Sequence, residues 1–161
     1  MWQDSSVERE PVLSVTDASD LLDLEERGWM RLQDAFATIA KERFEDIGVT
    51  PEWSAKDVTH HIAYWLEDAA NALEAMREGT WEPVIETDDY VEATNQAEGR
   101  RSKTISPGEV RVYLVESRDR LRFELGAMSE VDGEAAEWFE EAAHMHYEEH
   151  SADLEAFGSS G

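Results

Sequence analysis

The chain has 161 residues, with 38 Asp and Glu against 14 Lys and Arg, so its formal net charge is −24. This length suits one domain, and a hydrophobic share of 41%, including six Trp, is enough to form a core. The charge excludes a basic surface that binds nucleic acid, because phosphates would be repelled. The absence of Cys excludes disulfides, thiolate metal ligands and a cysteine nucleophile.

The N-terminal residues are acidic (MWQDSSVERE), unlike a signal peptide, and no apolar run approaches the ~18 residues of a membrane helix. We therefore expect a cytoplasmic protein that binds neither membranes nor nucleic acid. Only three of the basic residues are Lys. A surplus of carboxylates with so few lysines favours the hypothesis of a salt-adapted, halophilic host, and an acidic protein of ordinary salinity is the alternative.

Apolar residues recur at three- and four-residue spacing through most of the chain, and no segment shows the alternation of a strand. This pattern predicts long helices at about 16–44, 55–77, 107–128 and 133–157. Polar N-caps mark the predicted starts: Thr16 or Asp17, Ser54, Ser106 and Asp132.

A long connection, residues 79–105, separates the second and third predicted helices and contains a short helix near residues 90–100. Short links elsewhere make sequential helices antiparallel, whereas the long one allows a crossover. We therefore predict an all-α fold, a four-helix bundle with one long crossover connection. The bundle forms a single domain over residues 16–157, between a flexible N-terminal segment, 1–15, and a flexible tail, 158–161.

Histidines are the most informative residues of the chain. His146 and His150 are four positions apart, so they lie about 40° apart on the apolar face of the fourth predicted helix. His61 lies on the apolar face of the second. Periodicity thus selects these three as inward-facing. His60 is rotated by about 100° around the helix axis from His61, and His144 by about 200° from His146. Both are therefore predicted to face the flank or solvent.

Three neutral imidazoles from two helices are typical of an open metal site, in which a coordination position stays free for water or substrate. His-x-x-x-His is one way to satisfy two buried rings, because both can reach the same ion. The alternative is a set of core histidines without metal. In that case they hydrogen-bond one another, a carboxylate, Tyr64 or Tyr147.

Two segments resemble the DinB-like superfamily. Residues 53–65 (WSAKDVTHHIAYW) resemble its second-helix signature, and residues 146–150 (HYEEH) resemble its fourth-helix signature. Asn95 and the helix start at residues 106–110 (SPGEV) are similar to those of members that include a colibactin self-resistance protein. The match extends over about residues 21–157.

The resemblance implies an up-up-down-down bundle that is often dimeric, and a divalent metal (zinc, nickel or iron) held by His61, His146 and His150. Family members include S-transferases that use bacillithiol or mycothiol, and a mycothiol-dependent maleylpyruvate isomerase. The implied function is a thiol-dependent S-transferase or a metal-assisted hydrolase that acts on a small electrophile. The alternative is a non-catalytic binding or stress-response bundle. Since the chain lacks Cys, any thiol is a low-molecular-weight co-substrate.

Further polar and aromatic residues are candidates beside the metal. Glu149, Tyr147 and Tyr64 are predicted to orient ligands or move protons, and Glu149 reads equally well as a solvated helix charge.

Substrate-binding candidates come from two other parts of the chain. Asn95 and Trp81 in the long connection are predicted at the mouth of a pocket, with plain packing as the alternative. Arg118 belongs to a group of seven basic residues within 100–122, which either receives an anionic substrate or pairs with nearby acids along the helix.

Overall fold

A computed structural model describes residues 17–160, and over this range the chain is helical and contains no strand. The elements in chain order are α1 (Ala18–Ala37), η1 (Lys41–Arg43), α2 (Ala55–Glu78), α3 (Asp88–Ser102), α4 (Pro107–Ala127), α5 (Gly133–Ala142) and α6 (His144–Ser159). This confirms the predicted all-α bundle. The predicted flexible segment 1–15 lies outside the described residues. Within them no helix is long and apolar enough to cross a membrane.

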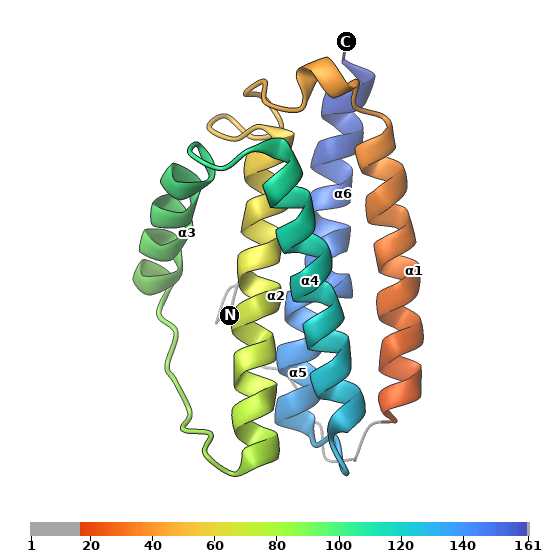
Figure 1. The fold of residues 1–161 in the computed structure, drawn as a ribbon, viewed down its shortest axis with the longest axis vertical. Helices are drawn as coiled ribbons and strands as arrows, with labels where there is room; N and C mark the ends of the chain where they lie inside the picture. The colour runs from red at the N-terminus through yellow and green to blue at the C-terminus, as the bar shows by residue number, and fades with distance from the viewer. Residues whose placement is uncertain (1–16, 161) are drawn as a thin grey trace.

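Figure 1 shows how the long helices are directed: α1 rises, α2 and α4 descend, and α5 continues into α6 on the way up. The main packing pairs are α2 with α4 and α1 with α6. Because α2 and α4 are parallel neighbours, the chain must cross back between them, and the long connection with α3 does so along the outside of α2. This order is up-down-down-up, so the up-up-down-down order implied by the resemblance is wrong.

Local sequence signals fix most helix ends as predicted. Ser54 begins α2 with a capping box, in which its hydroxyl accepts the Asp57 N–H and the Asp57 carboxylate accepts the Ser54 N–H. Ser106 and Glu109 form the same box at the start of α4. Gly79 ends α2 with a φ of 76°, a left-handed conformation that glycine adopts without strain.

The first helix is shorter than predicted, because α1 ends at Ala37 rather than near residue 44. The Thr38 hydroxyl donates to the Ala35 carbonyl at 2.7 Å and satisfies one of the last orphan acceptors of the helix. The end of α6 packs against this turn so closely that a Cβ on Gly158 would lie 2.0 Å from Thr38 Oγ1. The chain then turns through η1, and Phe44 folds back into the core.

The fourth predicted helix is two helices, since Ala143 has φ −100° and ψ −110° and separates α5 from α6. The sequence around Ala143 contains no Gly or Pro that would have predicted this break. It lies where α1 approaches most closely, and a Cβ on Gly28 would be 3.0 Å from His144 Cβ. The apolar periodicity nevertheless survives the break, because Phe139, His146 and His150 are all buried.

A buried carboxylate forms salt bridges between two helices of the bundle. Glu25 of α1 is completely buried and accepts hydrogen bonds at 2.6 Å from Arg118 Nε and from Arg122 Nη1, both on α4. Arg118 also pairs with the half-exposed Glu26, and its guanidinium lies 4.4 Å from the Trp29 ring centroid. These contacts join α1 to α4, which otherwise touch little.

Replacing Glu25 by Gln should therefore lower the free energy of unfolding by about 3 kcal/mol, because two arginines lose the carboxylate that compensates their burial. The matched change Glu26→Gln, at a half-exposed position, should cost less than about 1 kcal/mol. Urea unfolding of both variants makes the comparison. Equal losses of unfolding free energy in the two variants would show that the buried Glu25 carboxylate does not stabilise the contact between α1 and α4.

Candidate metal centre

Three imidazoles converge between α2 and α6. Nε2 of His146 lies 2.9 Å from Nε2 of His61 and 2.9 Å from Nε2 of His150. One ligand nitrogen from each ring lies within 4.8 Å of the others. The three side chains are buried, with exposed fractions of 7%, 2% and 6% for His61, His146 and His150. The structure thus brings together the three histidines that periodicity selected.

Hydrogen bonding alone does not satisfy this cluster. A neutral imidazole nitrogen is either one donor or one acceptor. His146 Nε2 faces two other Nε2 atoms at bonding distance, so it can pair well with only one of them. A tetrahedral ion with Zn–N bonds of 2.0–2.1 Å would instead place its ligand nitrogens roughly 3.3 Å apart. The donor set therefore fits a divalent metal better than it fits a network of imidazoles.

Burial keeps these rings neutral. Desolvation lowers the pKa of His61 and of His146 well below the usual 6.5, and the neighbouring imidazoles lower it further. Desolvation lowers the pKa of His150 to about 4. Since only the neutral imidazole binds a metal, the site is ready to coordinate an ion well into the acidic range.

Asn95 and Trp53 surround the exposed edge of the cluster. The Asn95 side chain hydrogen-bonds His61, and its Oδ1 accepts the indole N–H of Trp65 at 2.8 Å. The Trp53 ring lies 4.7 Å, centroid to centroid, from the His61 ring. His61 is thus held on one side by a fixed amide and on another by an aromatic face, the kind of support that sets the orientation of a metal ligand.

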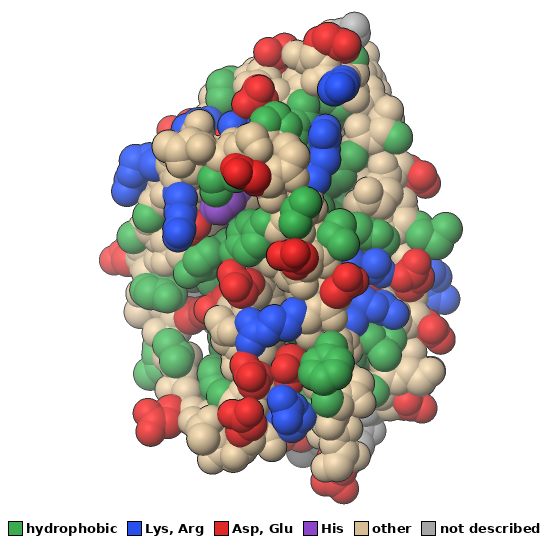
Figure 2. Space-filling view, viewed as in Figure 1, with side chains coloured by type: hydrophobic (Ala, Val, Ile, Leu, Met, Phe, Trp, Pro, Cys, Tyr) green, Lys and Arg blue, Asp and Glu red, His purple; other side chains and the backbone are tan. Residues whose placement is uncertain are grey.

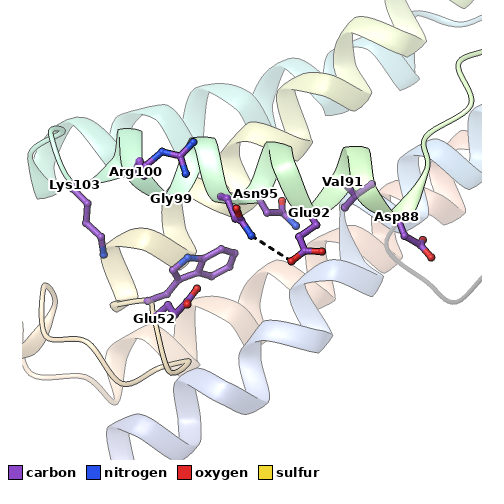
Figure 3. Close-up of a pocket in the computed structure, with 10 residues that line it drawn as sticks. Glu52, Asp88, Val91, Glu92, Asn95, Gly99, Arg100 and Lys103 are labelled. Atoms are coloured by element: carbon purple, nitrogen blue, oxygen red, sulfur yellow. Dashed lines mark hydrogen bonds between the residues drawn. The ribbon is translucent and has the colours of Figure 1, made fainter.

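A groove of about 760 Å³ lies next to these two residues, between α3 and the segment that leads into α2. Figure 3 shows lining residues along one face of α3, such as Asn95 and Arg100, with Glu52 on the opposite side of the groove. The lining consists of Glu52, Trp53, Asp88, Val91, Glu92, Asn95, Gln96, Gly99, Arg100 and Lys103. Because Asn95 and Trp53 touch both the groove and His61, the groove is the natural approach for a small molecule.

The predicted catalytic candidates lie in different surroundings. Tyr147 is fully buried on the α1 side of α6, where its ring packs against Trp29 and its hydroxyl interacts with Arg118. Burial raises its pKa well above the usual value. Tyr64 packs against Trp65, and burial together with Asp68 raises its pKa to about 12. Glu149 is an exposed residue of α6.

The substrate-binding candidates divide in the same way. Asn95 lies at the cluster, as described. Trp81 packs on Trp138 of α5 and donates to Glu134 at 3.0 Å, so it lies beyond the far end of α2, roughly 25 Å along the axis from His61. Arg118 is occupied by Glu25 and Glu26. The structure therefore places neither Trp81 nor Arg118 in the groove.

The expectation that His60 faces the flank or solvent is wrong, because α3 covers it. His60 is 3% exposed, and its Nε2 lies 2.8 Å from Glu98 Oε2 on α3. Its ring lies 5.4 Å from that of Tyr113 on α4. His144 is half-buried at the start of α6 and belongs to no such cluster.

Sequence reasoning missed the supporting residues of the site. Trp65 and Gly99 were predicted neither as catalytic nor as substrate-binding residues. Trp65 nevertheless donates a hydrogen bond to Asn95. A Cβ on Gly99 would lie 3.1 Å from Trp53 Nε1, so only a residue without a side chain lets α3 pack this closely. One signal was available for Trp65, since it follows His61 by four residues and so shares its helix face. The small size of Gly99 is meaningful only once α3 is placed beside Trp53.

Two solved structures resemble this fold: the mycothiol-dependent maleylpyruvate isomerase, and a histidine-to-alanine mutant of that enzyme. Each matches with a TM-score of 0.69 and 16% sequence identity over 86% of this chain. The chain spans 61% of the length of those structures. No protein-family model and no curated protein matches the chain. The likeness confirms the DinB-like fold, and at this identity it establishes the fold alone.

The metal-free protein should lose stability in acid through these histidines. The pKa of His150 is about 4 when folded, against 6.5 for an ordinary imidazole, so below pH 6.5 the unfolded chain binds a proton that the folded chain does not. The unfolding free energy then falls as pH drops and levels off below pH 4, with a loss of about 3 kcal/mol from this group. Urea unfolding across this range should show a weaker pH dependence for His150→Gln. An unchanged dependence would contradict the burial argument.

Proposed function

We propose that the chain is a divalent-metal enzyme that transfers a low-molecular-weight thiol to a small electrophilic substrate. The convergence of three buried, neutral Nε2 atoms carries this proposal. One fact supports the thiol: the structures that share its fold are those of an enzyme named as mycothiol-dependent. Since the chain has no Cys, the thiol would be a separate small molecule. A cytoplasmic location, where small thiols stay reduced, fits this chemistry.

His61, His146 and His150 would hold the metal. A cation on three neutral ligands keeps its full charge, and it supplies a Lewis acid that lowers the pKa of a thiol or water bound to it. The protein keeps the rings neutral by burial. Because the three ligands come from two helices that pack in the bundle core, their positions are fixed before any ion arrives.

The groove along α3 would receive the thiol or the electrophile. Its volume of about 760 Å³ falls within the ~300–1,000 Å³ typical of small-molecule sites. Asn95 borders both the groove and the cluster, so it would orient His61 and present its amide to a bound molecule. Trp53 would cover His61 against bulk water.

Metal content is the first test. Protein purified without a histidine tag should contain or take up about one equivalent of zinc, nickel or iron, and His146→Ala should retain less than a tenth of that. His144→Ala is the matched control, because it removes a half-buried histidine from the same helix without touching the cluster. Stoichiometric binding by His146→Ala would overturn the ligand set.

Thiol transfer is the second test. The metal-loaded protein should accelerate the reaction of mycothiol or bacillithiol with monochlorobimane, whose fluorescence appears when a thiol displaces chloride. His146→Ala should return the rate to that of the uncatalysed reaction. A protein that binds one metal ion and accelerates none of these reactions would overturn the enzymatic proposal, and would favour the non-catalytic binding bundle.

Asn95 should tune the metal site from outside. We expect Asn95→Leu to weaken metal affinity by about 10–100-fold, because His61 loses the amide that fixes its ring. Gln96→Leu is the matched control, since Gln96 lines the same groove and its side-chain amide donates to Glu92 at 3.3 Å rather than to His61. Competition with a chelator measures both affinities. Equal affinities for the two variants would show that Asn95 does not position His61.

A further inference from the structure

A second cavity, of about 260 Å³, lies in the seam between α1 and α4. Its walls come from α1, from the turn that follows α1, from α2 and from α4. They consist of Trp29, Gln33, Phe36, Ile39, Lys41, Phe44, Thr59, Arg111, Leu114 and Val115. The cavity shares no residue with the groove along α3. It exists because α1 ends at Ala37, which makes the chain turn across the top of the seam.

The floor of this cavity is apolar and well packed. Ile39, Phe44 and Leu114 are 9%, 7% and 4% exposed, so they belong to the bundle core. Val115 is 47% exposed at the rim. A small apolar body could therefore lie on buried side chains while one end remains near the surface.

The charge of the lining is opposite to that of the protein. The chain has 38 acidic residues, yet the described residues that line the cavity include two cations, Lys41 and Arg111, and no carboxylate. Among the described residues neither cation forms an ion pair. Figure 2 shows basic side chains beside hydrophobic ones on the upper part of this face.

Arg111 is held in place by an aromatic ring. Its guanidinium carbon lies 4.3 Å from the centroid of Phe44, a cation–π contact that holds this exposed side chain against the cavity wall. The planar group is stacked by one face, and the N–H donors along its edges stay available for a carboxylate. By contrast, Arg118 and Arg122 of the same helix are occupied by Glu25.

We propose that this cavity binds a small amphiphilic carboxylate, such as a medium-chain alkanoate, with its apolar part on Ile39, Phe44 and Leu114 and its carboxylate paired with Arg111. Three features select this ligand class together: an apolar floor, cations at the wall, and no acid among the described residues that line the cavity. The volume, below the ~300–1,000 Å³ of drug-sized sites, suits a small ligand. The site is separate from the metal centre and does not depend on the proposed function.

Octanoate is a suitable probe, and titration calorimetry in moderate salt, which screens the net charge, measures its affinity. Arg111→Gln should weaken binding about tenfold or more, because a charge-assisted hydrogen bond is lost. Octanol should bind the wild type more weakly by a similar factor. Val115→Trp should block the cavity and abolish binding. In the wild type octanoate should also change the fluorescence of Trp29, and Trp29→Phe removes that signal.

The matched control is Arg31→Gln, which removes an exposed cation of α1 that makes only 3.7 Å contacts with Glu148 and Glu155. It should bind octanoate like the wild type. The proposal is overturned if Arg31→Gln and Arg111→Gln weaken binding equally, or if octanol binds as tightly as octanoate. It is also overturned if light scattering shows a dimer that Val115→Trp dissociates and that excludes the probe, because a second copy would then occupy the cavity.

Discussion

Desolvation of three imidazoles is the constraint on which this site depends. A neutral imidazole nitrogen either donates or accepts one hydrogen bond, so His146 Nε2, which faces two other Nε2 atoms at 2.9 Å, can pair well with only one of them. The same burial that makes the rings poor bases makes them good ligands, since no proton must be removed before a metal binds. Function and instability in acid therefore have one physical origin.

Three arginines of α4 form ion pairs with glutamates of neighbouring helices. Arg118 and Arg122 neutralise the buried Glu25, and Arg120 pairs with Glu74 of α2 at 2.6 Å. Arg118, Arg120 and Arg122 of α4 thus act as counterions for α1 and α2. Arg111 differs, because it stacks on the Phe44 ring and forms no ion pair with any carboxylate of residues 17–160.

The features that depend only on residues close together in the sequence were predicted correctly. The capping boxes at Ser54 and Ser106 and the inward faces of His61, His146 and His150 follow from spacing alone, and the structure has all of them. The break at Ala143 and the early end of α1 could not be predicted in this way. Both arise from the close approach of α1 to α6, which only the assembled bundle defines. The burial of His60 could not be predicted either, because the helix that covers it, α3, is distant in the sequence.

The crossover explains why α3 matters more than its weak amphipathicity suggests. A bundle in which α2 and α4 are parallel requires a long return connection, and this chain places a helix there that packs mainly on α2. That helix adds little to the core, since only its Val91 and Ser102 are buried, but it brings Asn95 to His61 and forms one wall of the groove. Since α3 is anchored by side-chain contacts such as Glu98 with His60, the topology that the fold requires also supplies the outer half of the site. Ligand recognition can then change along α3 while the buried histidines and the core stay the same.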